Sequence, residues 1–322
     1  MPYPRSRVTR QEPTTRTLVA RHHRLELGGA PLVMGILNAT PDSFSDPGAG
    51  RDLPGRVARG LKLLGEGADM LDVGGESGVT NRPPVDAQEE IERVAPLIAS
   101  LTAHRAVVSV DTYKSAVAQA ALDAGAALVN DPSGLIDPDV AALCAARGAA
   151  LVVTHTRARP KQKLVRPRYE DVVEDVKRLL AERLEVALAA GVPADRLLVC
   201  PGPDLGKDPA QTIELLRRLD ELHTLGFPIL LAVSRKDFVG ALTARPPQAR
   251  LAGTLAAVGH GTDRGAQVVR VHDVAATRDF LAVRGALRGP LPVPADLALA
   301  EDLRREPLPQ EEGQASPKEA VA

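Results

Sequence analysis

Eight short apolar runs recur along this chain, and longer alanine- and leucine-rich stretches separate them. The runs cover residues 32–37, 70–73, 107–110, 126–129, 150–153, 197–200, 229–233 and 267–271. Runs that are apolar throughout predict strands buried on both faces, which is typical of a parallel sheet. The stretches between them, including 88–101 and 169–190, have the spacing of amphipathic helices. Eight strand–helix units within about 250 residues predict a single (β/α)8 TIM barrel, a fold of the α/β class.

The main structural alternative is an open, doubly wound parallel sheet. That fold carries a Gly-x-Gly-x-x-Gly turn after its first strand, and no such turn follows residues 32–37. We therefore expect one barrel domain over residues 29–290 of the 322-residue chain. We interpret residues 1–28 as a flexible basic tail, and residues 291–322, rich in Pro, Glu and Ala, as a disordered tail.

The charge balance limits the classes of partner. Lys and Arg total 40 and Asp and Glu total 41, so the net charge of −1 does not favour nucleic acid or an anionic membrane surface. No apolar run approaches the roughly 20 residues of a membrane span, and residues 1–28 lack the apolar core of a secretory signal. Two cysteines, Cys144 and Cys200, are too few for a disulfide framework. We expect a cytoplasmic protein that acts on small molecules, with no nucleic-acid or membrane partner.

Polar residues stand at the end of every predicted strand. The active site of a (β/α)8 barrel lies at the C-terminal ends of its strands, so these residues are the candidates for function. They are Asn38, Asp72, Asp111, Asn130, residues 154–157, residues 200–207, residues 234–237 and residues 270–273. A single Asp or Ser after a strand is often only a helix cap, and we expect this for Asp46, Asp131 and Ser133. Eight polar ends around one mouth are costly to desolvate unless a polar ligand meets them.

The types of side chain predict the kind of ligand. Asp111 and Asn130 can accept and donate hydrogen bonds along the edge of a flat heterocycle. Lys236, Arg270 and His272 can hold an anion such as a phosphate. The sequence therefore predicts a ligand that combines a heterocyclic ring with phosphate groups.

The end of the first predicted strand suggests a metal ion. Asn38 and Asp42 offer hard oxygen ligands that suit a magnesium ion which keeps most of its water. The sequence contains no nucleophile elbow and no zinc-protease spacing. The residues therefore indicate charge stabilisation rather than a covalent intermediate.

Six segments of the chain are similar, in the same order, to those of one known family. They are LNATPDSFS at 37–45, DVGGES at 72–77, SVDT at 109–112, NDPSG at 130–134, SRK at 234–236 and RVHD at 270–273. Each segment alone is weak, but together they are specific, and residues 32 to about 285 resemble dihydropteroate synthase. Members of that family are (β/α)8 barrels that join 4-aminobenzoate to 7,8-dihydropterin-6-ylmethyl diphosphate and release diphosphate.

The resemblance implies roles for the residues that would act on the pterin. Asp111, Lys236 and Arg270 would be the catalytic residues. Asp111 and Asn130 would bind the pterin edge, and Lys236 would reach the pterin ring. A carboxylate such as Asp111 can stabilise the positive charge that develops on the pterin methylene, which suits a weakly nucleophilic aromatic amine.

The resemblance also implies how the remaining substrate groups and the metal would be held. Arg270 and His272 would hold the diphosphate, and Ser234 would contribute to substrate binding. Arg82 resembles the Arg of a conserved Arg-Pro in the second strand-end loop, and would also bind substrate. Asn38 would coordinate Mg²⁺, which helps diphosphate to leave by neutralising its charge. Family members are often dimers, so a homodimer is expected.

Three departures from the family pattern affect the pocket. Cys200 stands where the family usually has an Asp that grips the guanidine-like edge of the pterin, and Asp204 either replaces that Asp or caps the next segment. Asp237 replaces a Ser that helps to hold the 4-aminobenzoate carboxylate at a helix start. The second loop, residues 76–83, is longer than in the family. A smaller change is Leu205, which stands where the family tends to have an aromatic residue. We expect the aminobenzoate side of the pocket to be reshaped.

Several functions fit these observations. The leading hypothesis is a dihydropteroate synthase of the folate pathway. The alternatives are a divergent paralogue that binds a pterin but is inactive or weak on 4-aminobenzoate, and a non-catalytic pterin-binding regulatory barrel. A methyltetrahydrofolate-dependent methyltransferase is a weaker alternative, because it would not need the anion-holding Arg270 and His272. Measuring diphosphate and dihydropteroate with and without 4-aminobenzoate separates a synthase from the two pterin-binding alternatives.

Overall fold

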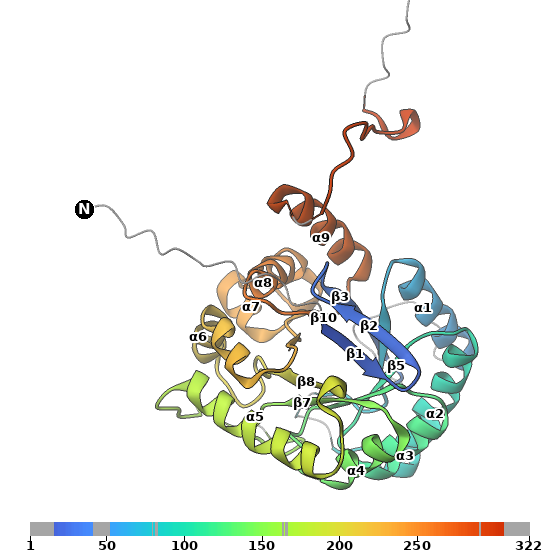
Figure 1. The fold of residues 1–322 in the computed structure, drawn as a ribbon, viewed down its shortest axis with the longest axis vertical. Coiled ribbons are helices and arrows are strands. Elements are labelled where there is room, and N and C mark those ends of the chain that lie inside the picture. Colours follow the sequence, from blue (N-terminus) through green and yellow to red (C-terminus); the bar gives the residue numbers. More distant parts are fainter. Residues whose placement is uncertain are drawn as a thin grey trace, which may run out of the picture.

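The computed structural model describes residues 16–40, 52–78, 80, 83–162, 164, 167–289 and 291–305. Within these residues, eight parallel strands form one barrel with helices around the outside (Figure 1). The strands are β3 (Leu32–Asn38), β4 (Met70–Gly74), β5 (Val108–Asp111), β6 (Leu128–Asp131), β7 (Ala150–Thr154), β8 (Leu197–Cys200), β9 (Leu230–Leu231) and β10 (Val268–Val271). Each strand overlaps one of the eight predicted runs, so the predicted fold class is confirmed.

The ring of strands closes between β8 and β9. Hydrogen-bonded neighbours run in the order β8-β7-β6-β5-β4-β3-β10-β9. A single parallel bridge between Val199 and Ile229 joins the two ends of this sheet. The N–H of Val199 also donates to the carbonyl of Pro228 at 2.9 Å. Because β9 has only two residues, this closure has fewer paired residues than the other junctions of the described barrel.

The connections between the strands form the outer layer. The helices are α1 (Leu53–Gly65), α2 (Ala87–Ala103), α3 (Ser115–Asp123), α4 (Asp139–Arg147), α5 (Val172–Ala189), α6 (Pro209–Arg217), α7 (Asp237–Thr243), α8 (Leu251–Asp263) and α9 (Val274–Arg288), with short 3₁₀ turns η1 (Ala194–Arg196), η2 (Leu219–Leu225), η3 (Pro247–Ala249) and η4 (Glu301–Leu303). Asp52, Asp86, Asp171 and Asp208 each accept a hydrogen bond from a backbone N–H in the first turn of a helix. These N-caps explain why α1, α2, α5 and α6 begin where they do.

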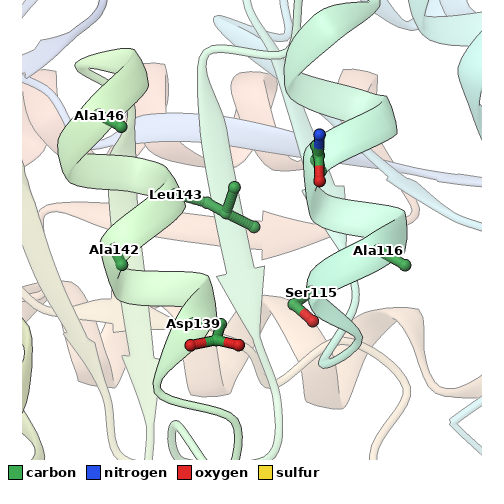
Figure 2. A pocket seen from close by; sticks show the side chains of 7 residues that line it. Ser115, Ala116, Asp139, Ala142, Leu143 and Ala146 are labelled. Atoms are coloured by element: carbon green, nitrogen blue, oxygen red, sulfur yellow. The ribbon is translucent and has the colours of Figure 1, made fainter.

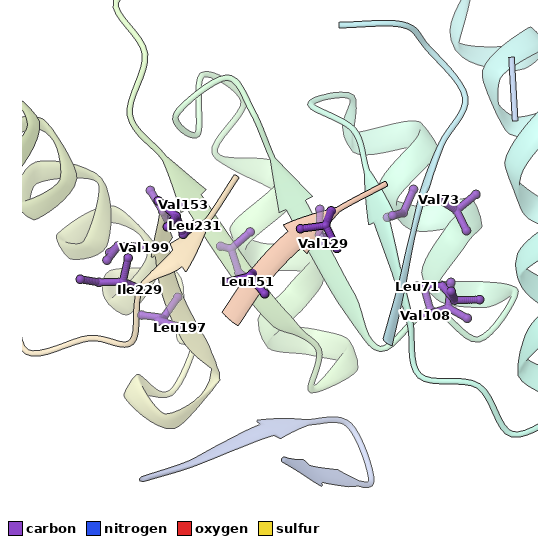
Figure 3. Close-up of a cluster of buried hydrophobic side chains, with 14 of the residues drawn as sticks. Leu71, Val73, Val108, Val129, Leu151, Val153, Leu197, Val199, Ile229 and Leu231 are labelled. Carbon is purple, nitrogen blue, oxygen red and sulfur yellow. The ribbon is translucent and has the colours of Figure 1, made fainter. Parts of the chain in front are cut away.

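Strand side chains alternate between two apolar regions. Outward-facing residues such as Leu71 and Val129 pack in the layer between the strands and the helices (Figure 3). Inward-facing residues such as Met70 and Leu128 fill the lumen of the barrel. Because successive strand residues point to opposite sides, the residue two positions after an inward one also faces the lumen. This alternation decides which strand-end side chains reach the central mouth.

An antiparallel hairpin covers the N-terminal end of the barrel. It consists of β1 (Arg16–Ala20) and β2 (His23–Leu27). Leu18, Ala20 and Leu27 are buried and pack with the lumen residues. The N–H of Arg21 donates to the carbonyl of Gly148, just before β7, at 2.8 Å. The expectation of a tail over residues 1–28 was therefore wrong for residues 16–27, whose alternating apolar side chains seal the barrel; residues 1–15 lie outside the described residues.

The C-terminal segment leaves the barrel after α9 (Figure 1). Residues 291–305 contain only the short turn η4, and their large apolar side chains, such as Leu297 and Leu303, are exposed. Residues 306–322 lie outside the described residues, so the extent of the predicted C-terminal tail stays a prediction. None of the helices in the described ranges combines the length and apolar character needed to cross a bilayer.

Candidate active site

Four polar side chains from neighbouring strands meet at the C-terminal mouth of the barrel. Arg270 on β10 donates from Nε to Asp72 Oδ2 at 2.5 Å, and from Nη2 to Asp111 Oδ2 at 2.6 Å. Asn130 on β6 donates from Nδ2 to Asp72 Oδ2 at 3.0 Å. The guanidinium of Arg270 thus holds two carboxylates in fixed positions, and Asn130 donates to one of them, the carboxylate of Asp72. We call Asp72, Asp111, Asn130 and Arg270 the lumen cluster.

Asp72 was among the strand-end candidates from the sequence, but no role in binding or catalysis was assigned to it. It is fully buried, and it stands two positions after the inward-facing Met70. A carboxylate at an inward position of an apolar strand was the signal that could have assigned it to the site. Asp72 Oδ1 and the nearby Ser109 Oγ, on the adjacent strand, are buried and make no hydrogen bond within the described part of the chain. Two such atoms below a mouth are suited to a polar ligand group or water.

Burial and opposite charges act against each other in the lumen cluster. Burial raises the pKa of Asp111 to about 7, while Arg270 works in the opposite direction. Burial also disfavours the charge on Arg270, but Asp72 and Asp111 raise the pKa of its guanidinium above the usual value. The side chain of Asp111 is 25% exposed, whereas Asp72 is not exposed at all. Asp111 is therefore the carboxylate that a ligand can reach.

A second group of polar residues follows β9 and β10. Ser234 Oγ and His272 Nδ1 are 2.9 Å apart, and the backbone N–H of His272 donates to Ser234 Oγ at 3.2 Å. Burial, with Arg235 and Arg270, lowers the pKa of His272 to about 3, so its imidazole is neutral at pH 7. Burial also lowers the pKa of Lys236, and within the described residues no carboxylate lies within ion-pair distance of its ammonium. Lys236 is thus a cation suited to a ligand.

The turn between β8 and α6 brings Asp204 to a different helix. Gly202, Asp204 and Gly206 have φ angles of 63°, 61° and 61°. Asp204 Oδ2 accepts hydrogen bonds from the backbone N–H groups of Asp237 at 2.5 Å and Phe238 at 3.2 Å. The carboxylate of Asp204 therefore binds the start of α7.

Cys200 keeps the inward position that the sequence comparison singled out. It is 3% exposed and packs with the apolar residues of the lumen. Burial raises the pKa of its thiol. A buried neutral thiol is a weak hydrogen-bond acceptor, so Cys200 does not offer a ligand what a carboxylate at its position would offer.

Lys207 and His155 form a buried support beneath the same turn. Lys207 Nζ donates to His155 Nδ1 at 2.7 Å and to the carbonyls of Gly202 and Leu205 at 2.9 and 3.1 Å. Burial lowers the pKa of Lys207 to about 7 and, together with Lys207, that of His155 to about 4. Because Nδ1 accepts, Nε2 carries the proton and faces Asp175 at 3.1 Å. His155 is a structural residue of the barrel, and Lys207 is a support that we had not predicted.

A family model described as "Pterin binding enzyme" matches residues 34–272 of the chain. This chain belongs to the pterin-binding enzyme family. The dihydropteroate synthase of Haemophilus influenzae is 36% identical over 267 residues, which cover 83% of this chain and 97% of that protein. A probable bifunctional folylpolyglutamate synthase/dihydropteroate synthase of Haloferax volcanii is 44% identical over 264 residues. The match covers 82% of this chain but only 31% of that longer protein.

Solved structures of pterin-binding enzymes agree in fold as well as in sequence. Xanthomonas albilineans dihydropteroate synthase with 4-aminobenzoic acid is 42% identical, with a TM-score of 0.80, and the match covers 87% of this chain and 100% of that one. The same enzyme in complex with 7,8-dihydropteroate is also 42% identical, with a TM-score of 0.77 and coverage of 86% and 100%.

Two loops beside the mouth of this pterin-binding enzyme are joined by ion pairs. Glu76, in the loop after β4, accepts from Lys114 Nζ at 2.5 Å and lies 3.0 Å from Nζ of Lys161, in the loop after β7. Lys114 also donates to the buried Glu90 at 2.6 Å. Burial opposes ionisation of Glu76, but the two lysines hold the pKa of its carboxyl below the usual value. These pairs fix the described part of the second loop against the rest of the rim.

A separate groove lies between α3 and α4 on the outer surface (Figure 2). Small side chains such as Ala116 and Ala142 leave the space, and Asp139 is the charged residue in its lining. None of the lumen-cluster residues lines this groove. It is a gap between helices of the pterin-binding enzyme rather than part of the mouth.

The structure brings most of the predicted site residues together. Hydrogen bonds through Asp72 join Asp111, Asn130 and Arg270. Ser234 bonds to His272, and the pKa of Lys236 responds to both Arg270 and Asp111. Asn38 ends β3, which pairs with β10 on one side and β4 on the other. Arg82, Asp42 and Asp46 lie outside the described residues.

Asp131 and Ser133 were expected to be helix caps, but the structure places them in a turn before α4, whose N-cap is Pro138. Asp131 Oδ1 accepts from both the backbone N–H and the hydroxyl of Ser133, at 2.7 and 2.6 Å. Asp131 follows the inward-facing Asn130, so it points away from the lumen. These two residues close a turn and do not face the mouth.

Proposed function

We propose that this pterin-binding enzyme is a dihydropteroate synthase. It is a transferase that condenses 7,8-dihydropterin-6-ylmethyl diphosphate with 4-aminobenzoate to give 7,8-dihydropteroate and diphosphate. The observation that carries this proposal is the lumen cluster, in which Arg270 holds Asp72 and Asp111 beside Asn130. The curated relative of similar length and the two solved neighbours support it, because all three are dihydropteroate synthases.

In the proposed mechanism the lumen cluster recognises the pterin. Asp111 accepts hydrogen bonds from ring N–H groups, and Asn130 can donate to or accept from the ring edge. Arg270 orients Asp111 and keeps the cluster from carrying an uncompensated negative charge. Lys236 donates to the pterin ring from the opposite side of the mouth.

The reaction is a substitution at the pterin methylene. The amine nitrogen forms a bond to the methylene carbon, the carbon–oxygen bond to diphosphate breaks, and the nitrogen loses a proton to solvent. Positive charge on the methylene is stabilised by the carboxylate of Asp111. Arg270, Ser234 and neutral His272 would hold the departing diphosphate by hydrogen bonds, and Arg82 would bind substrate from the second loop.

A magnesium ion fits the donors at the mouth. Asn38 offers one amide oxygen, and within the described residues no group of three or more His, Cys, Asp or Glu side chains is arranged for a metal. This suits an ion that keeps its water and binds mainly through substrate phosphates. When bound, Mg²⁺ would neutralise charge on the diphosphate and so make it a better leaving group.

A second function is favoured by a specific observation. Cys200 gives the pterin edge no carboxylate, and Asp204 is bound at α7 rather than beside it. These features fit a paralogue that binds a pterin but uses 4-aminobenzoate weakly, or a non-catalytic pterin-binding barrel with a regulatory role.

One assay separates these functions. The purified chain is incubated with dihydropterin methyl diphosphate and Mg²⁺, with and without 4-aminobenzoate, and diphosphate and dihydropteroate are measured. Both products identify a synthase. Diphosphate release that ignores the amine identifies a paralogue, and pterin binding without release identifies a sensor.

We also propose that the enzyme is a cytoplasmic homodimer. Both cysteines, Cys144 and Cys200, are free and buried, which suits a reducing compartment. The dimer is proposed from the family resemblance alone. Light scattering of the purified chain tests it, because a monomer would have half the expected mass.

A further inference from the structure

The carboxylate of Asp204 occupies an unusual position for a side chain of the β8–α6 turn. Asp204 adopts a left-handed backbone conformation, which non-glycine residues seldom take, although Asp tolerates it better than most. Gly202 and Gly206, on either side of it, have the same conformation. Lys207 fixes the turn by donating to the carbonyls of Gly202 and Leu205. The turn is thus built to project Asp204 away from β8.

The hydrogen bonds of Asp204 use the donors at the start of α7. Oδ2 accepts from the backbone N–H groups of Asp237 and Phe238, and Oδ1 accepts from Thr212 Oγ1 at 3.0 Å. Asp237, the first residue of α7, adds a second carboxylate whose side chain is 86% exposed and pairs with Arg250 at 2.9 Å. The backbone N–H groups of Asp237 and Phe238 are therefore already bound by the carboxylate of Asp204.

This carboxylate also acts on the lysine of the mouth. Lys236 immediately precedes α7. Among the charged neighbours of Lys236, Asp204 has the largest effect in raising its pKa, ahead of Asp111. Asp204 therefore already compensates part of the positive charge that Lys236 would offer to an anionic ligand.

We propose that Asp204 is a specificity-determining residue that disfavours amine substrates carrying a negative charge on the side that faces α7. The inference rests on the proposed function, because it concerns the amine that attacks the pterin. An amine that packs beside Lys236 meets the carboxylate of Asp204, and Asp237 adds a second negative charge that its ion pair with Arg250 partly compensates. A neutral substituent escapes the resulting repulsion, so the mouth accepts an uncharged arylamine relatively better than its carboxylate analogue.

The test compares two amines of nearly the same shape. Dissociation constants are measured for 4-aminobenzoate and its neutral analogue 4-aminobenzamide, using the full chain with Mg²⁺ and inorganic diphosphate. The variants are Asp204→Gly, which suits the left-handed backbone, and Asp204→Asn, which keeps the shape of the side chain. Asp220→Asn removes an exposed carboxylate on η2, at the other end of α6, and is the matched control.

The expected result is a change in the ratio of the two dissociation constants. Both Asp204 variants should bind 4-aminobenzoate about tenfold more tightly and 4-aminobenzamide within about twofold of the original value. Added salt should lower the ratio of the dissociation constant of 4-aminobenzoate to that of 4-aminobenzamide in the original chain, because salt screens the repulsion, and it should not change this ratio in the variants. A merely structural role for Asp204 would weaken both amines alike and leave the ratio unchanged.

Each outcome decides the inference separately from the proposed function. An unchanged ratio, a loss of affinity for both amines, or no measurable binding of either amine to any form would overturn the inference. Dihydropteroate formation is assayed on the same samples. If the ratio shifts but no dihydropteroate forms, the proposed function is contradicted and the inference stands. If dihydropteroate forms but the ratio does not shift, the inference is contradicted and the proposed function stands.

Discussion

The two ends of the barrel are built from the same strands but from opposite kinds of side chain. At the N-terminal end, Leu18 and Leu27 of the hairpin are buried and pack with the apolar residues of the lumen. At the C-terminal end, Arg270, Asp111 and Lys236 are buried or half-buried around the mouth. Apolar burial stabilises the fold, whereas desolvated charges cost free energy unless they are paired.

Stability should therefore depend mainly on the N-terminal end of the barrel, and activity on the C-terminal end. Substitutions at the hairpin should change the free energy of unfolding and leave the kinetics alone. Substitutions at the mouth should change the kinetics by more than they change stability.

Replacing Arg270 should have the largest effect on activity. A lysine can bind Asp72 or Asp111, but it cannot hold both in the geometry of the guanidinium. We expect Arg270→Lys to lower kcat/KM about 10³-fold in the dihydropteroate assay. The control is Arg278→Lys, because Arg278 pairs with Asp69 near the N-terminal end and should retain nearly full activity. Equal losses in the two variants would refute the separation.

Truncating the hairpin core should have the largest effect on stability. Leu18 is 1% exposed and packs with the apolar residues that fill the N-terminal part of the barrel. We expect Leu18→Ala to lower the free energy of unfolding by about 3 kcal/mol, measured by urea denaturation, with kcat/KM unchanged. Leu188→Ala, at a position 42% exposed on α5, should cost less than about 1 kcal/mol. A drop in kcat/KM for Leu18→Ala would show that the two ends are coupled.

Asp131 should produce a pH dependence of stability. It is buried, its Oδ2 makes no hydrogen bond within the described residues, and burial raises its pKa to about 6. The folded state therefore holds the proton more tightly than the unfolded state, so this contribution is present below about pH 4 and is lost as pH rises through about 6. Relative to Asp131→Asn, the original chain should lose about 2 kcal/mol of unfolding free energy over that range. Parallel pH profiles for the two forms would contradict the assignment.

Replacing Cys200 by Asp should increase the affinity of the mouth for a pterin. An Asp at this inward position would face the guanidine-like edge of a pterin, with Lys207 and Lys236 nearby to offset its charge. We expect Cys200→Asp to bind 6-hydroxymethylpterin about tenfold more tightly in a calorimetric titration. Cys144→Ser, between α4 and the barrel wall, should leave the affinity unchanged. Unchanged affinity in Cys200→Asp would mean that the ring does not approach β8.

Most of the fold could be predicted from the sequence because the barrel strands are short and apolar throughout. The hairpin was missed because β2 alternates between charged and apolar residues, with Leu25 between Arg24 and Glu26, and because it lies within an arginine-rich segment. Such a segment is stable only when the barrel covers its apolar face. Nothing local to residues 16–27 indicates that cover.

The site could be predicted where a residue is one of the last two of its strand and faces inward. Asp111, Asn130 and Arg270 satisfy this condition, and the structure joins them by hydrogen bonds through Asp72. Asp204 could not be placed in advance, because its partner is α7, 33 positions further along the chain. The same holds for Lys207, whose acceptors depend on the fold of the turn that it supports.

The junction between β8 and β9, which has a single bridge, is the weakest junction of the described barrel wall. Every other pair of adjacent strands is joined by at least two residues from each side, so thermal opening of the wall should begin between Val199 and Ile229. Asp204 connects the two sides of this junction, because it lies in the segment after β8 and binds the helix after β9. One carboxylate thus links the two segments beside the weakest junction of the wall and also carries a negative charge near the mouth.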